Sequence, residues 1–87
     1  MNWFTADRMK ELQVITKKDV RRDLREIKKT IKRHAKYFPL DEYVSVGQHQ
    51  REYATRNRWI PYLLERGFSI TETESLNGYK EVRIYWK

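Results

Sequence analysis

Apolar and polar positions alternate with a helical period between residues 17 and 37. The apolar positions recur at intervals of three or four residues: Val20, Leu24, Ile27, Ile31, Ala35 and Phe38. This spacing predicts a long helix with an apolar stripe along one side. Thr16 and Asp19 match a capping box at its start, with Asp in the place usually taken by Glu. Pro39 ends the helix near Tyr37, because the residue before a proline avoids the helical region.

A short helix is predicted to precede the long one. Thr5 is placed to cap it, and the helix should end near Gln13. Phe4 and Met9 have the spacing of a hydrophobic staple. Trp3 and Phe4 also suit contact with a partner or a second copy, but we expect them to pack onto the long helix.

The second half of the chain predicts a strand, a helix and a hairpin. A β-prone run covers residues 43–46, and residues 48–58 fit a helix slightly better than an ordered loop. A helix that restarts near Trp59 would place Pro61 in its first turn, where proline is tolerated. Gly67 is well suited to the position just after that helix.

Two alternating runs near the C-terminus, residues 68–74 and 82–86, predict a β-hairpin. A two-residue turn would mix polar and apolar side chains on both faces. A three-residue loop with Gly78 in the left-handed bulge position instead places Ile70 opposite Ile84 and gathers the apolar side chains on one face. We expect this second register. The short strand should pair with the hairpin, giving three antiparallel strands.

The pattern as a whole predicts an α+β fold in a single domain spanning 1–87. Residues 1–38 would form a basic helical part, and residues 39–87 a strand, helix and hairpin part. An 87-residue chain with 14% aromatic residues can bury one small core. The pattern does not decide whether Trp59 belongs to it. The expected core is Leu24, Ile27, Ile31, Val44, Val46, Ile60, Leu63, Leu64, Phe68, Ile70, Val82, Ile84 and Trp86.

The segments WIPYLLERGFSI and VRIYWK resemble a pattern found in small phage-encoded accessory proteins. In that pattern Leu-x-x-x-Gly-Phe/Tyr leads into a hairpin whose last strand ends in apolar-x-Trp. The residues that carry the match are Leu63, Leu64, Gly67, Phe68, Ile84 and Trp86. The resemblance implies an α+β fold and a viral origin, but it assigns no functional residue. The hairpin also resembles the wing of winged-helix DNA-binding domains, which need two full helices before it.

The net charge of +7 is concentrated in one part of the chain. Residues 1–38 carry twelve Lys/Arg and five Asp/Glu, whereas residues 39–87 carry seven of each. On a helical wheel, the cations of the long helix fill an arc of about 140° that contains no acid. Asp19, Asp23 and Glu26 gather on a separate edge. An unmixed arc of this kind is typical of a surface that contacts phosphates.

We therefore expect a nucleic-acid-binding protein for DNA or RNA. Its expected contacts on the long helix are Arg21, Arg25, Lys28, Lys29, Lys32 and Lys36. Arg51, Arg56 and Arg58 are expected as secondary contacts, within a segment that also carries Gln48, His49, Gln50, Tyr53 and Asn57. The same residues also fit a merely solvated surface, or a module that binds an acidic protein surface.

Catalysis, cofactors and membranes are poorly supported by the sequence. The chain has no cysteine, and neither His34 nor His49 has a partner at the spacing of a metal site or a catalytic triad. With three glycines it has no phosphate-binding loop. We expect a protein that is not an enzyme and takes no cofactor or metal. The sequence has no apolar run long enough to span a membrane and no leader pattern. We therefore expect a cytoplasmic location, in the host cell if the protein is viral. The oligomeric state is left open.

Overall fold

The computed structural model describes residues 5–12 and 14–86. The elements in chain order are α1 (Ala6–Leu12), α2 (Lys17–Tyr37), β1 (Tyr43–Gly47), the 3₁₀ helix η1 (Arg51–Thr55), α3 (Arg56–Glu65), β2 (Ser69–Glu74) and β3 (Lys80–Tyr85). This order confirms the predicted α+β fold. The expected roles of Trp3 and Phe4 concern residues outside the described range.

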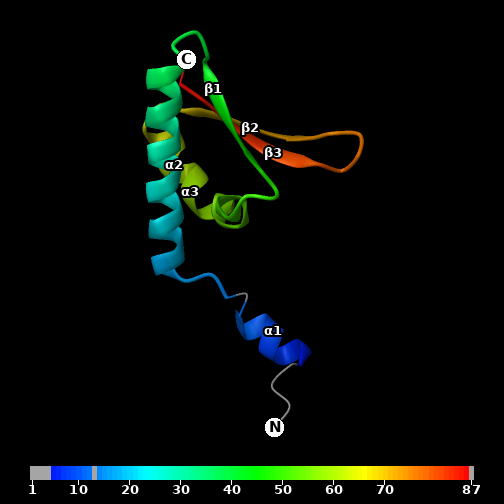
Figure 1. The fold of residues 1–87 in the computed structure, drawn as a ribbon. Helices are drawn as coiled ribbons and strands as arrows, with labels where there is room; N and C mark the ends of the chain where they lie inside the picture. The colour runs from blue at the N-terminus through cyan, green and yellow to red at the C-terminus, as the bar shows by residue number, and fades with distance from the viewer. Residues whose placement is uncertain (1–4, 13, 87) are drawn as a thin grey trace.

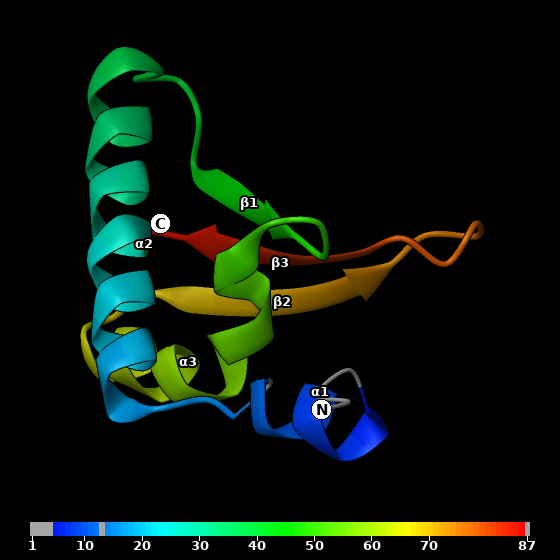
Figure 2. The ribbon, with the colours of Figure 1, turned by 60° about the horizontal axis from the view of Figure 1, so that its bottom comes forward.

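The body of the molecule consists of α2, α3 and the sheet, with α1 lying apart from them (Figure 1). Figure 2 shows α2 standing across one end of the strands, while the β2–β3 hairpin extends away from it. The radius of gyration is 15.4 Å, against about 12 Å for a compact chain of this length. Helix α1 and the β2–β3 hairpin, which both extend from the body, account for this larger value.

The three strands lie in the order β1-β3-β2, and both pairings are antiparallel. Ile84 of β3 lies opposite Ile70 of β2 and opposite Val44 of β1, as the alternation of apolar residues requires. At the hairpin tip, the Ser75 N–H donates to the Tyr79 carbonyl at 2.7 Å. Gly78 has a φ of +84°, which a residue with a Cβ rarely adopts. The predicted register and bulged loop are confirmed.

Helix α2 begins with the predicted capping box. The Thr16 hydroxyl accepts from the Asp19 N–H at 3.1 Å, and the Asp19 carboxylate accepts from the Thr16 N–H at 3.0 Å. This second hydrogen bond is the main reason that the pKa of Asp19 is lowered from its ordinary value. The helix ends at Tyr37, before Pro39. Both predicted ends of α2 are therefore confirmed.

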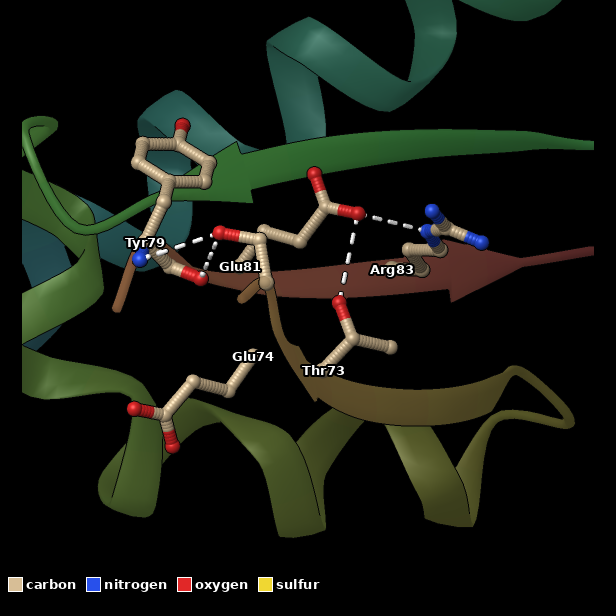
Figure 3. Close-up of a pocket in the computed structure, with 6 residues that line it drawn as sticks. Thr73, Glu74, Tyr79, Glu81 and Arg83 are labelled. Atoms are coloured by element: carbon tan, nitrogen blue, oxygen red, sulfur yellow. Dashed lines mark hydrogen bonds and ion pairs between the residues drawn. The ribbon is translucent and has the colours of Figure 1, made fainter. Parts of the chain in front are cut away.

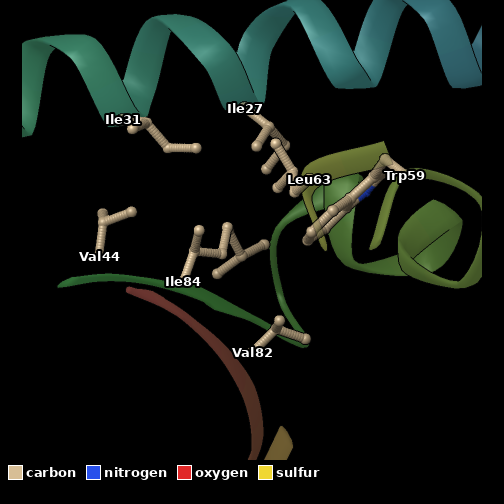
Figure 4. Close-up of a cluster of buried hydrophobic side chains, with 8 residues drawn as sticks. Ile27, Ile31, Val44, Trp59, Leu63, Val82 and Ile84 are labelled. Atoms are coloured by element: carbon tan, nitrogen blue, oxygen red, sulfur yellow. The ribbon is translucent and has the colours of Figure 1, made fainter. Parts of the chain in front are cut away.

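The core lies between α2, α3 and one face of the sheet (Figure 4). Ile27 and Ile31 of α2 point toward strand residues such as Ile84. Trp59 of α3 is completely buried, and its indole N–H donates to the Glu52 carbonyl at 2.9 Å. Burial of this large side chain is favourable because its one polar group has a partner. Trp59 is thus a core residue, which the sequence pattern leaves undecided.

Ile27 and Ile31 of the predicted apolar stripe are buried, but burial elsewhere along this segment differs from the prediction. Ala35 and Phe38 were expected in the apolar stripe, but both are exposed. Asp23 was expected on a separate acidic edge, but it is only 1% exposed. Asp19 and Glu26 on the same edge have side chains that are 31% and 44% exposed, so the helix is turned only far enough to bury Asp23. The physical reason is that Asp23 finds cationic and hydroxyl partners on η1, which the spacing of apolar residues along α2 cannot reveal.

Two predictions about α3 are also wrong. Leu64, expected in the core, is 50% exposed, while its neighbour Leu63 is 1% exposed. The helix begins at Arg56 and not near Trp59, so Pro61 lies in the second turn. Pro61 therefore has no N–H to donate to the Asn57 carbonyl. Both residues are exposed, so water can satisfy that carbonyl.

Candidate functional site

The outward side of α2 carries the predicted cations on one continuous surface, which we call the basic face. All six of its residues are exposed: Arg21, Arg25, Lys28, Lys29, Lys32 and Lys36. At a rise of 1.5 Å per residue, they span about 22 Å along the helix. The structure thus brings together every α2 residue that the sequence assigned to the site.

The basic face is only weakly neutralised by the rest of the chain. Lys29 lies 3.5 Å from a carboxylate oxygen of Glu26. Lys28 lies over the ring of Tyr62, and Lys36 lies near the ring of Tyr37. Aromatic rings hold a cation in place without cancelling its charge. In the part of the chain that the structure describes, the remaining members of the basic face form no ion pair with a carboxylate: Arg21, Arg25 and Lys32.

The inward turn of Asp23 removes one carboxylate from the surface beside the basic face. The Thr55 hydroxyl donates to Asp23 Oδ2 at 2.9 Å. Asp23 Oδ1 lies 3.3 Å from Arg51 Nη2 and 3.6 Å from Arg22 Nε. A buried carboxylate needs such partners to offset its lost hydration. The same contacts connect the middle of the chain to α2, and so set how the helix is rotated.

Two of the three arginines expected as secondary contacts form ion pairs within the fold. Arg51 is paired with Asp23, and Arg56 donates to the Glu72 carboxylate at 2.8 Å while lying over the Tyr53 ring. Arg58 is exposed. Arg51 and Arg56 therefore have carboxylate partners within the fold, whereas Arg21, Arg25 and Lys32 of the basic face have none among the described residues.

Polar side chains around the turn after β1 are also occupied within the fold. The Gln48 side-chain oxygen accepts from the Lys80 N–H, and the Gln50 side-chain oxygen accepts from the Gly47 N–H. His49 lies against the Tyr79 ring, with 5.7 Å between ring centroids. Gln48 and His49 thus hold the turn against the hairpin, and Gln50 closes the turn itself.

A hollow of about 230 Å³ lies near the hairpin tip (Figure 3). Its central acid, Glu81, accepts from Arg83 at 2.7 Å and from Thr73 at 3.2 Å. The hydrogen bond from Arg83 is the main reason that the pKa of Glu81 is lowered. Glu81 is therefore ionised at neutral pH and held by its neighbours, an arrangement suited to stabilising the hairpin.

One polar pair was missed by the sequence argument. His34 Nε2 lies 2.8 Å from Asp41 Oδ2, although His34 was expected to have no catalytic or metal-ligand partner. The two residues are seven apart and meet because Pro39 turns the chain back. The pair lines a second hollow together with Ser45, but no hydrogen bond joins Ser45 to His34 among the described contacts. Among the described contacts, no nucleophilic side chain is hydrogen-bonded to this pair. The pair therefore connects α2 to the following turn.

The described residues offer little evidence of other kinds of site. They contain no group of three or more His, Asp or Glu side chains placed to hold a metal ion. None of their helices combines the length and apolar character needed to cross a bilayer. The basic face therefore remains the strongest candidate site. Comparison with protein-family models, curated proteins and solved structures finds no match to this chain.

Proposed function

We propose that this protein is a non-catalytic nucleic-acid-binding protein that contacts phosphates through the basic face of α2. The observation that carries the proposal is the exposed run of six cations, most of which have no carboxylate partner among the described residues. Exposed Lys and Arg side chains along one side of a helix complement the charge of a phosphate backbone.

The hairpin is a poorer candidate for contacting nucleic acid. Its tip exposes Leu76 fully, which alone would suit insertion between bases. The hairpin also carries Glu72, Glu74 and Glu81 against Lys80 and Arg83, a net charge of −1. An acidic arm repels a phosphate backbone. The proposal therefore assigns no contact to β2, β3 or the hairpin tip.

Fluorescence anisotropy with labelled 20-nucleotide DNA and RNA, single-stranded and duplex, tests the proposal. With four to six phosphate contacts, affinity should fall by about 10²- to 10³-fold between 50 and 200 mM salt. Reversing Arg25, Lys28 and Lys32 to Glu should abolish binding. These side chains are exposed, so the variant should keep its circular dichroism spectrum.

A matched control reverses Lys10, Lys17 and Lys18 to Glu. This variant has the same net charge as the first but an intact basic face, so it should keep most of the affinity. Equal loss in both variants would show that binding depends on net charge only and contradict the assignment to α2. If the wild-type protein binds no nucleic acid at 50 mM salt, the proposal is wrong, and an acidic protein surface becomes the partner to test.

A further inference from the structure

A groove of about 280 Å³ runs between α2 and α3, beside the basic face. Its floor is apolar and is formed by Ile31, Leu63 and Phe68. Its rim is cationic and is formed by Lys28, Lys32 and Arg66. Two of the three rim cations also belong to the basic face, so the groove opens directly onto the proposed phosphate path. No carboxylate is among the described residues that line it.

Tyr62 holds two of the rim cations in place. The Arg66 guanidinium carbon lies 3.4 Å from the centre of the Tyr62 ring, and Lys28 Nζ lies 4.6 Å from it. Arg66 also donates to the Tyr62 carbonyl at 3.1 Å. The pKa of the Tyr62 hydroxyl is lowered, first by its hydrogen bond with Lys28. The cations are thus positioned by a ring and a carbonyl, and their charge remains available to an anion.

The apolar floor and the cationic rim together restrict what can bind in the groove. A phosphate alone would satisfy the rim and leave the apolar floor uncovered. A duplex presents phosphates outward and keeps its bases stacked inside, out of reach of the floor. An unpaired nucleotide carries both a phosphate and a flat base, and such bases stack on aromatic rings and on guanidinium planes. The volume is just below the range of about 300–1,000 Å³ usual for small-molecule pockets, so it suits one such unit.

We infer that this groove binds one unpaired nucleotide, with its phosphate among Lys28, Lys32 and Arg66 and its base against Phe68. This inference rests on the proposed function, because the basic face would deliver the strand to the groove. It adds a preference that the basic face alone does not produce: the protein should bind single strands more tightly than duplexes.

The test compares a labelled 12-nucleotide oligothymidylate with a labelled 12-base-pair duplex by fluorescence anisotropy. Wild-type protein should bind the single strand at least fivefold more tightly, the lower end of what one stacked base contributes. Arg66→Ala should remove most of that preference. Arg25→Ala removes the same charge from the basic face outside the groove, so it should weaken both complexes alike and keep the preference.

A direct readout comes from the aromatic protons of Phe68. Their NMR signals should shift when oligothymidylate is added, and Phe68→Leu should lose the single-strand preference while keeping an apolar floor. Equal affinity for the two wild-type complexes, or equal effects of Arg66→Ala and Arg25→Ala on both, would overturn the inference and leave the proposed function standing. If neither the oligothymidylate nor the duplex binds at low salt, the proposed function itself is wrong.

Discussion

The Thr55 hydroxyl and the Asp23 carboxylate form a buried hydrogen bond of 2.9 Å between residues 32 positions apart. Thr55 is 4% exposed and Asp23 is 1% exposed. The pair joins η1 to the N-terminal third of α2, and Arg51 lies beside it. The rotation of α2, and with it the direction in which the basic face points, depends on this contact.

Replacing Thr55 with Val should therefore destabilise the protein. The substitution keeps the shape of the side chain but leaves Asp23 without its hydroxyl donor, which costs about 1–3 kcal/mol in unfolding free energy. Urea denaturation measures the loss. In a double-mutant cycle, Thr55→Val should cost much less in an Asp23→Ala background, because the two residues act through one contact. Additive losses would show that the hydrogen bond contributes nothing.

The neighbouring leucines of α3 should respond differently to truncation. Leu63→Ala removes a side chain that is 1% exposed and should cost about 2–5 kcal/mol. Leu64→Ala removes one that is 50% exposed and should change the unfolding free energy by less than about 1 kcal/mol. Thermal and urea unfolding of the two variants provide the measurement. Similar losses at both positions would contradict the observed packing of α3.

The capping box of α2 should contribute to the loss of unfolding free energy at low pH. The pKa of Asp19 is lower in the folded protein than in a free aspartate, so its contribution is present above about pH 4 and is lost as pH falls through the lowered value. Asp19→Asn should therefore show a smaller drop in unfolding free energy between pH 5 and pH 2 than the wild type. Thr16→Ala, which removes the cap itself, should cost about 1 kcal/mol at neutral pH. An unchanged acid response in Asp19→Asn would refute this role.

A side chain at position 47 should displace Tyr79. A Cβ at position 47 would collide with the Tyr79 hydroxyl. Tyr79 lies at the hairpin tip and is 36% exposed, so its ring can move aside. Gly47→Ala should therefore displace the Tyr79 ring from His49 and lower the unfolding free energy by less than about 1 kcal/mol. In a Tyr79→Ala background the same substitution should have little effect on the urea midpoint. A full loss in that background would place the strain elsewhere.

The elements that the sequence determined are those whose signals are local. Thr16 and Asp19 lie three residues apart, and Ile70 and Ile84 are brought opposite each other by the Gly78 loop in the register that the alternation of apolar residues favours. Capping and alternation act between neighbours along the chain or across one turn. For this reason the start of α2, its length, and the hairpin register could all be read directly. The membership of the basic face could be read as well, because its six cations share one side of a single helix.

Only the tertiary structure decided how these elements meet. The inward turn of Asp23, the exposure of Leu64 and the pairing of Arg51 depend on partners from distant parts of the chain. The groove beside the basic face likewise needs Arg66 and Phe68 to arrive next to Lys28. A helical period records which residues share a side of one helix. It carries no information about what packs against that side, because burial and pairing energies arise between elements.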